Sequence, residues 1–380
     1  MMHKFLSVIT LLVVLTVSSR AKDDLDNLAT PPIYACNGTC VTYYLCEGNK
    51  IITDGTGIID IRVGEDFTSE CPSYLEVCCE KESVLDETPA TATKPPRQAI
   101  EYTCGARNAD GLGFRITGNN NGESEYGEFP WMLAILREGE VLESVLTVFE
   151  CGGSLIAPNV VLTAAHCVKN QPKGTLLVRG GEWDTQITHE LHPHQDRRVR
   201  EVITHSQFQK GTLANDVALL ILDQPFELAE NIQPVCLPPK NFNFDGSSCF
   251  ASGWGKNHFG KEGKYQVILK KVQLPIVPHN RCDKAMRTTR LGNSFRLHRS
   301  FICAGGNKDE DTCRGDGGSP LVCPIPDVPT NYYQAGIVSW GIGCGEQGIP
   351  GVYANVAMFR DWIDQQLSQF HVESKHYTYT

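Results

Sequence analysis

The sequence has a deficit of positive charge and only one long apolar run. Lys and Arg number 34 against 44 Asp and Glu, so the formal net charge is −10. We find no basic stripe, and we therefore expect neither nucleic acid nor an anionic membrane surface as a partner. The long apolar run lies between Phe5 and Val17, and no later run approaches the roughly 18 consecutive apolar residues that a membrane-spanning helix needs.

The sequence also lacks paired C-x-x-C motifs, although it contains 16 Cys. This absence argues against metal coordination by cysteine. Residues 1–21 combine a basic start at Lys4, the apolar run, and small residues at Ser19 and Ala21, a pattern that predicts a cleaved secretory signal peptide. An even number of Cys in a secreted, extracellular chain predicts disulfides.

The Cys residues fall into two groups, which indicates two domains. Residues 34–80 contain six of them in a segment too short for apolar burial alone to stabilise, so we expect three disulfides there, in one of about 15 arrangements. Residues 81–103 are polar, contain several Pro, and predict an extended linker.

Residues 104–368 carry short apolar or alternating runs separated by Gly, Pro and Asn, which is typical of an all-β sandwich or barrel. A helix is predicted only near the end, where one face is formed by Val356, Phe359, Ile363 and Leu367. We expect residues 369–380 to form a flexible tail.

Three short stretches carry a possible catalytic centre: "TAAHC" at 163–167, "NDVALL" at 215–220 and "CRGDGGSPL" at 313–321. In this order and at these separations they resemble the His, Asp and nucleophile regions of the trypsin/chymotrypsin family of serine proteases. The resemblance covers roughly residues 104–368. It implies an all-β fold of two six-stranded antiparallel barrels with a cleft between them, followed by a C-terminal helix.

The resemblance assigns the general base to His166, the acid that orients it to Asp216, and an oxyanion-hole position to Gly315. The nucleophile position holds Gly317, because this chain reads G-D-G-G-S-P where the family reads G-D-S-G-G-P. Ser319 lies two residues along, as much as about 7 Å away, whereas attack needs reacting atoms within roughly 3–3.5 Å. We therefore predict a pseudo-protease whose degenerate triad has a structural role.

The resemblance also implies a specificity pocket for Arg or Lys, with Asp311 at its floor and Gly341 and Gly351 in its walls. Two interpretations remain open for this pocket. It either docks a basic side chain without cutting it, or it is a solvated remnant.

An activation switch is implied by "GFRITG" at 113–118, where cutting after Arg115 makes Ile116 a new N-terminus for Asp316 to receive. The family usually continues with Val-Gly-Gly, and this chain does not. Arg97, in the linker, is an alternative cut site.

Disulfide pairs follow from the same kind of comparison. The first group of Cys resembles the clip domain of arthropod secreted proteases, and "CNGTC" within it offers Asn37 as an N-glycosylation site. Clip domains imply three pairs: Cys36–Cys78, Cys40–Cys71 and Cys46–Cys79. The protease family implies five more: Cys104–Cys236, Cys151–Cys167, Cys249–Cys323, Cys282–Cys303 and Cys313–Cys344.

Residues 180–196 lie where trypsin-like relatives carry a calcium loop, and Glu182 matches one ligand. Oxygen atoms of Glu182, Asp184 and Asp196 suit calcium, although exposed acids often contact only water. His189, His192 and His194 are spaced as zinc ligands can be, but exposed loop histidines explain them as well. No other cofactor is expected.

A clip domain joined to a protease domain without its Ser resembles the arthropod clip-domain serine protease homologues. This resemblance implies a haemolymph protein that an upstream trypsin-like protease cuts, and that then acts as a non-enzymatic cofactor between prophenoloxidase and its activating clip-domain protease in melanisation, with oligomerisation after cutting. Two alternatives remain. One is an adhesion or microbial-recognition protein, and the other is an active trypsin-like protease.

Overall fold

The structure is a computed structural model of the chain. The described residues are 39–42, 46–47, 50–51, 76–79, 102–112, 122–141, 144–172, 174–186, 190–255, 266–307, 316–343 and 346–380. The predicted signal peptide, Asn37 and most of the predicted linker lie outside these ranges. None of the described helices combines the length and the apolar character needed to cross a membrane.

The N-terminal unit contains two small antiparallel sheets. β1 pairs with β4, with Cys40 opposite Cys78, and β2 pairs with β3. Their bounds are β1 Thr39–Thr42, β2 Cys46–Glu47, β3 Lys50–Ile51 and β4 Glu76–Cys79. The three predicted clip disulfides involve side chains outside the described part of the chain, so they stay predictions.

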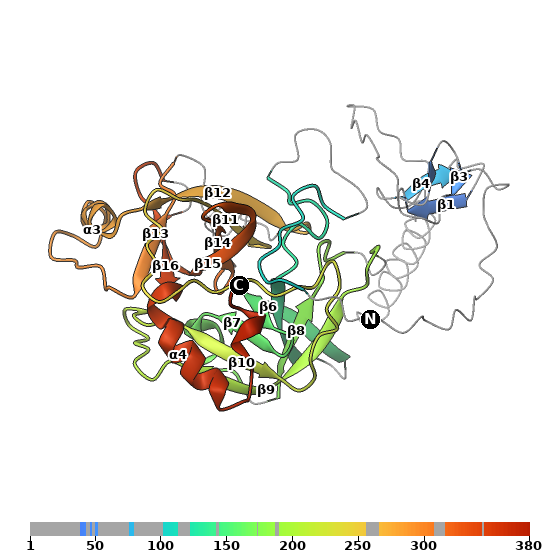
Figure 1. Ribbon diagram of the computed structural model, residues 1–380, viewed down its shortest axis with the longest axis horizontal. Helices are drawn as coiled ribbons and strands as arrows, with labels where there is room; N and C mark the ends of the chain where they lie inside the picture. Colours follow the sequence, from blue (N-terminus) through green and yellow to red (C-terminus); the bar gives the residue numbers. More distant parts are fainter. Residues whose placement is uncertain are drawn as a thin grey trace, which may run out of the picture. The chain divides into compact units, whose positions relative to one another are not determined.

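The first barrel of the larger unit is a closed antiparallel sheet in the order β10-β7-β6-β5-β8-β9. Figure 1 labels its strands β6, β7, β8, β9 and β10. Every residue of β7 and β10 is buried, because these apolar strands pack on both faces. β9 is mostly polar and keeps few residues buried. The bounds are β5 Met132–Val141, β6 Ser144–Ala157, β7 Val160–Thr163, β8 Leu176–Gly180, β9 Gln195–Thr204 and β10 Ala218–Leu222.

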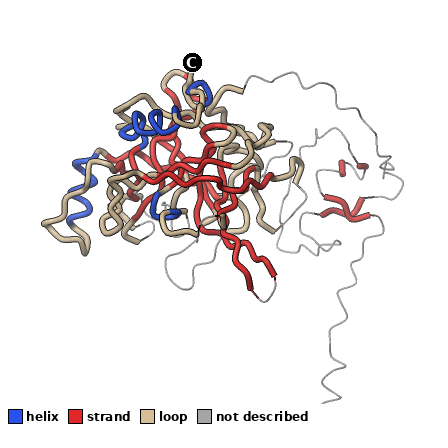
Figure 2. Tube along the Cα trace, turned by 90° about the horizontal axis from the view of Figure 1, so that it is seen from below, coloured by secondary structure: helices blue, strands red, loops and turns tan. Residues whose placement is uncertain are grey.

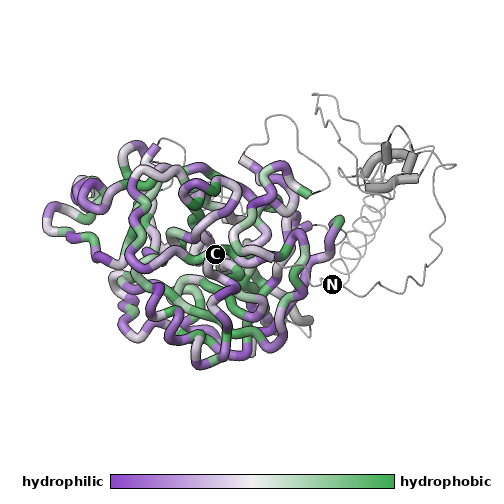
Figure 3. Tube along the Cα trace, in the orientation of Figure 1, coloured by the Kyte–Doolittle hydropathy of each residue, from purple (hydrophilic) through white to green (hydrophobic). Residues whose placement is uncertain are grey.

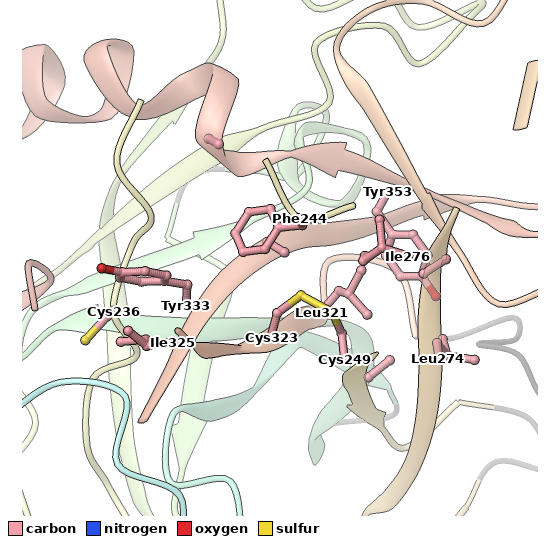
Figure 4. Close-up of a cluster of buried hydrophobic side chains, with 14 of the residues drawn as sticks. Cys236, Phe244, Cys249, Leu274, Ile276, Leu321, Cys323, Ile325, Tyr333 and Tyr353 are labelled. Carbon is pink, nitrogen blue, oxygen red and sulfur yellow. A yellow bond between two sulfur atoms is a disulfide. The ribbon is translucent and has the colours of Figure 1, made fainter. Parts of the chain in front are cut away.

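The second barrel closes in the order β11-β12-β13-β16-β15-β14, and Figure 2 shows the strands of both barrels in red. Its core gathers Phe244, Leu274, Leu321 and Tyr353 around the Cys249–Cys323 disulfide (Figure 4). The bounds are β11 Ser248–Gly253, β12 Lys270–Val277, β13 Phe301–Ala304, β14 Pro320–Ile325, β15 Val328–Trp340 and β16 Gly351–Asn355. The predicted all-β fold of two six-stranded antiparallel barrels is therefore confirmed.

Three α-helices are described in this unit, α2 (Ala165–Val168), α3 (His279–Arg287) and α4 (Val356–Ser368). The predicted apolar face of α4 is confirmed, because all four of its residues are buried.

Residues 369–380 do not form the flexible tail that we expected. They include the short η3 (Ser374–His376), and Tyr377 is buried, with its carbonyl accepting the backbone N–H of Leu237 at 2.8 Å. The Arg360 guanidinium lies 5.2 Å from the Tyr377 ring centre. The tail therefore belongs to the barrel unit, because an aromatic ring and an arginine on α4 provide a contact that tail composition alone does not reveal.

Four of the five disulfide pairs that the resemblance implies for this unit are formed, and the fifth, Cys313–Cys344, lies outside the described residues. The formed pairs are Cys104–Cys236, Cys151–Cys167, Cys249–Cys323 and Cys282–Cys303.

Candidate functional site

His166 and Asp216 meet at the junction of the two barrels. α2, directly after β7, carries His166, and the loop before β10 carries Asp216. Asp216 is fully buried, and its Oδ2 lies 2.7 Å from His166 Nδ1. The same carboxylate accepts the His166 backbone N–H at 2.8 Å and the Ser339 hydroxyl, from β15, at 2.6 Å. Because a carboxylate can only accept, the Nδ1 position of His166 holds the proton, and Nε2 is left as the basic atom.

Gly317 lies next to that basic atom. A β-carbon built on Gly317 would be 2.9 Å from His166 Nε2, so a side chain at this position would point at the imidazole. The Gly317 backbone is held in place, because its carbonyl accepts the N–H of Gly152 at 2.9 Å and the next residue, Gly318, donates to Val338 at 2.9 Å. The geometry for proton transfer is retained, but no hydroxyl stands at position 317.

Ser319 does not take over the role of nucleophile. It is 1% exposed, and its hydroxyl oxygen has no hydrogen-bond partner in the described part of the chain. That oxygen packs against Gly152 and Gly253, because a β-carbon at Gly152 would lie only 2.0 Å from it and one at Gly253 would lie 3.3 Å from it. The hydroxyl is thus under the loop, in space that glycines leave open, and a buried hydroxyl there cannot reach a substrate carbonyl.

Asp316, the predicted receiver of a new N-terminus, is directed into the second barrel. Its Oδ1 accepts the backbone N–H of Gly255 at 2.8 Å, and its carboxylate leaves no room for a β-carbon at Gly253 or Gly255. Arg115 and Ile116 lie outside the described residues, as does Arg97. The structure therefore describes Asp316 but not the new N-terminus that it would receive, and the activation switch stays a prediction.

Comparison with known proteins agrees with this geometry. Residues 119–363 match the trypsin family, and residues 34–80 match the family described as serine protease clip domain PPAF-2. The chain belongs to the trypsin family.

Among its trypsin-family relatives are proteins named for phenoloxidase activation and for inactivity. Phenoloxidase-activating factor 2 of Galleria mellonella is 54% identical over 299 residues, which cover 77% of this chain and 98% of that protein. Inactive CLIP domain-containing serine protease A28 of Anopheles gambiae is 38% identical over 87% of this chain and 89% of its own length. Inactive CLIP domain-containing serine protease A8 of the same species is 37% identical, over 91% and 92% respectively.

The predicted specificity pocket is described only in part. Asp311 lies outside the described residues, and so does Gly315 of the oxyanion hole. Gly341 is exposed, and a β-carbon there would meet only the Gly343 carbonyl, at 3.7 Å. Gly351 is buried at the start of β16. The wall at Gly341 is thus open to solvent, and the docking interpretation stays a prediction.

The acidic loop after β8 differs from the predicted calcium ligand set. Asp196 is bound by Arg179 through two hydrogen bonds, of 2.8 and 2.9 Å, and Asp184 Oδ1 accepts the N–H of Gln186 at 3.0 Å. The structure instead places Glu190, which our sequence analysis missed, beside Glu182. Glu190 Oε1 accepts the N–H groups of Trp183 and Asp184 at 3.1 and 2.9 Å, and this contact has no spacing signal in the sequence.

Two carboxylate oxygens in this loop are left without partners. Glu182 Oε1 and Glu190 Oε2 are buried and accept no hydrogen bond from the described residues. Burial raises the pKa of Glu182 to about 7, against the opposing effect of Arg179. Burial, reinforced by the Glu182 charge, raises the pKa of Glu190 to about 8. Unpartnered carboxylate oxygens of this kind fit calcium, which takes only oxygen ligands.

Two of the three histidines of the same region each lie beside a glutamate. His192 faces Glu230 at 3.3 Å, and His194 faces Glu182 at 3.6 Å, while His189 lies outside the described residues. His166 lies close to Cys151 and Cys167, but these two are joined as a disulfide and offer no thiolate ligand.

Proposed function

We propose that this chain is a secreted, non-catalytic protease homologue that acts, after proteolytic cutting, as a cofactor in prophenoloxidase activation. The observation that carries the proposal is the glycine at position 317, which faces a His166–Asp216 pair that is otherwise complete. The similarity to a protein named Phenoloxidase-activating factor 2 supports the pathway, and the relatives named inactive support the loss of catalysis. The proposal includes secretion through residues 1–21 and glycosylation of Asn37.

The partners follow from this role. They are prophenoloxidase, its activating clip-domain protease, and an upstream trypsin-like protease that cuts this chain. The cofactor would bring the first two together without forming or breaking a peptide bond itself. Oligomerisation after cutting is part of the same proposal.

The cut site decides whether the clip domain stays attached. The segment 102–112 is held to the barrels by the Cys104–Cys236 disulfide and by Arg107, whose Nε donates to Glu128 at 3.0 Å and whose guanidinium lies 4.1 Å from the Phe250 ring centre. A cut after Arg115 leaves everything before it covalently tethered through that disulfide. A cut after Arg97 leaves the clip domain without a covalent link to the barrels.

We also propose that Glu182 and Glu190 hold a structural calcium ion in the acidic loop. Calcium would satisfy the two buried oxygens, and it would replace the protons that burial favours on the two carboxyl groups. A ligand that binds only the folded state stabilises it by about 2.7 kcal/mol at a hundred times its Kd. Calcium should therefore raise the thermal midpoint of the wild type relative to EGTA, and Glu190→Gln should abolish the difference, whereas the exposed-site control Glu230→Gln should retain it.

The test of the cofactor function is phenoloxidase activity in a purified mixture of prophenoloxidase and its activating protease. We expect the activity to rise when the cut form of this protein is added and to stay at baseline with the uncut form. Variants Arg97→Gln and Arg115→Gln, each treated with the same upstream protease, then locate the cut that matters. An equal result with cut, uncut and absent protein would reject the cofactor role.

A further inference from the structure

The segment from His279 to Arg299 departs from the charge of the rest of the chain. It contains six Lys or Arg and a single acid, Asp283, in a protein whose formal net charge is −10. α3 and the loop that follows it supply these cations. The cations do not form an unbroken basic run, because apolar and small residues separate them in the sequence.

The single acid of the segment is directed inward. Asp283 Oδ1 accepts the backbone N–H of Leu297 at 2.8 Å, and its Oδ2 accepts a hydrogen bond from Arg287. Arg287 in turn donates to the Phe295 carbonyl at 3.0 Å. Asp283 and Arg287 therefore neutralise each other while they hold the loop against α3.

Five cations remain without a carboxylate partner in the described part of the chain. They are exposed to solvent, and they are Arg281, Lys284, Arg290, Arg296 and Arg299. We call these five residues the basic face. Since no acid of the segment remains to compensate them, they produce a local positive potential on an otherwise acidic protein.

The basic face stands on an anchored scaffold. Cys282 and Met286 are fully buried, and the disulfide to Cys303 joins α3 to β13. On α3, Lys284 lies opposite these two buried residues, and Arg281 is exposed on the flank of the helix. The loop is fixed by the buried Leu297 and by Phe295, whose ring contacts Trp340 edge to face at 6.1 Å. Figure 3 shows hydrophilic colours along much of this segment.

A pocket of mixed character adjoins the basic face. It has a volume of about 350 Å³, and its polar lining is Asn243, Asp245, His279, Arg299 and Asn355. Its apolar lining is Phe242, Phe244, Val277, Phe301 and Ile302. Asn355 occupies the N-cap position of α4 without making a capping hydrogen bond, and its amide oxygen has no partner in the described part of the chain. The pocket thus offers amide groups for hydrogen bonding beside Arg299, with Asp245 as its one carboxylate.

Outside the pocket, the surface offers charge and hydrogen bonds but no exposed large hydrophobic side chain in the described part of the chain. In the described part of the chain, the exposed large hydrophobic residues are Val148 and Val202, both in the first barrel. Protein interfaces usually contain projecting aromatic or aliphatic anchors, whereas the apolar groups of this surface lie inside the pocket. Clustered Lys and Arg are typical of sites for heparin-like polymers and nucleic acids. The adjoining pocket favours a polymer rich in hydroxyl groups.

We propose that the basic face and its adjoining pocket bind a linear sulfated polysaccharide. Sulfate groups would pair with the cations, and sugar hydroxyls would hydrogen-bond to the amide groups of the pocket. This binding neither requires nor supports the cofactor role, so the two can fail separately.

The test measures the affinity of the full chain for a heparin oligosaccharide, for its desulfated counterpart, and for a DNA duplex of equal charge. We expect binding to the sulfated sugar that weakens steeply with salt, and weak binding to the other two. The variant Arg281→Ser/Lys284→Ser should weaken heparin binding by more than tenfold, at roughly fivefold per cation.

The control variant is Arg200→Ser/Lys210→Ser, which removes two exposed cations from the first barrel and changes the net charge equally. It should bind heparin like the wild type, and thermal unfolding of both variants verifies that they fold. Equal loss in the two variants, or no binding of heparin, would overturn the proposal. Binding of DNA as tight as that of heparin would also overturn it, in favour of a nucleic acid.

Discussion

The two halves of the candidate site differ in which catalytic groups they retain. The network of His166, Asp216 and Ser339 retains every group and every hydrogen bond needed to orient a general base. The neighbouring loop has lost the hydroxyl at Gly317 and holds a hydroxyl two residues later that is buried under the backbone. The difference separates what folding requires from what catalysis requires.

Burial explains why the network persists. Asp216 is fully buried, so each donor that it loses would leave a desolvated carboxylate uncompensated. A side chain at position 317 would instead point toward His166, whose side chain is 28% exposed. Folding therefore demands the carboxylate and its donors, whereas only the chemistry demands the hydroxyl.

Restoring the hydroxyl at position 317 tests this separation most directly. We expect the largest effect of all the variants from it, as an increase in the rate of labelling by an active-site probe. Loss of a triad nucleophile costs about a millionfold in turnover. If the rest of the centre is intact, Gly317→Ser in the cut protein should label with a fluorophosphonate probe at least about a thousandfold faster than the wild type. The imidazole must move slightly, because the new β-carbon would lie 2.9 Å from His166 Nε2.

The control for that experiment is Gly317→Ser combined with His166→Ala, which supplies the hydroxyl without its base and should not label. An unreactive Gly317→Ser would mean that more than the hydroxyl has been lost. Labelling of the wild type at Ser319 would contradict the placement of that residue and the non-catalytic role together.

Removing the carboxylate probes the other half. Asp216→Ala leaves the Ser339 hydroxyl and the His166 backbone N–H without their acceptor in a buried place, so we expect a loss of about 3 kcal/mol in the free energy of unfolding. Chemical denaturation measures it, with Asp361→Ala, at an exposed ion pair with Lys240, as the control. A loss no larger than that of the control would mean that the network has no structural role.

The fold and the triad positions could be predicted because they depend on local motifs at fixed places. The stretches around His166 and Asp216 are recognisable one at a time, and the structure brings the two residues together. Ser339 carries no such signal, since it reaches Asp216 from 123 residues away. Sequence distance excluded Ser319 as the nucleophile, but only the structure shows which glycines surround it.

The parts that sequence reasoning missed depend on long-range packing. Tyr377 is buried because α4 and the strand-connecting segment at Leu237 provide its surroundings. Glu190 approaches Glu182 because the loop folds back on the N–H groups of Trp183 and Asp184. The basic face exists because Asp283 turns inward. The excess of cations in residues 279–299 can be counted in the sequence. Neither residue type nor spacing reveals the contacts of Tyr377, Glu190 or Asp283.

A second histidine, His205, extends the comparison to the pH dependence of the free energy of unfolding. His205 packs 5.3 Å from the Phe359 ring centre and 5.1 Å from that of Trp362, and burial lowers its pKa. The unfolded chain therefore binds a proton more readily below pH 6.5, so stability falls as the pH drops through that value. In His205→Phe, which keeps an aromatic ring without a titrating group, the free energy of unfolding should fall less steeply between pH 7.5 and 5. An unchanged slope would reject this role of His205.

We expect the smallest change in the free energy of unfolding from Ser319→Ala. If this hydroxyl held the loop together through a hydrogen bond, Ser319→Ala would lower the free energy of unfolding. Its oxygen makes no hydrogen bond in the described part of the chain, so the substitution removes a buried hydroxyl that gains nothing in the folded state. We expect the free energy of unfolding to stay unchanged or to rise by about 1 kcal/mol.

The control variant is Ser319→Val. It should destabilise the protein, because the added methyl groups would collide with the closely packed Gly152 and Gly253. A loss from Ser319→Ala as large as that from Ser319→Val would mean that the hydroxyl has a partner, and the division between chemistry and packing would then not hold in this loop.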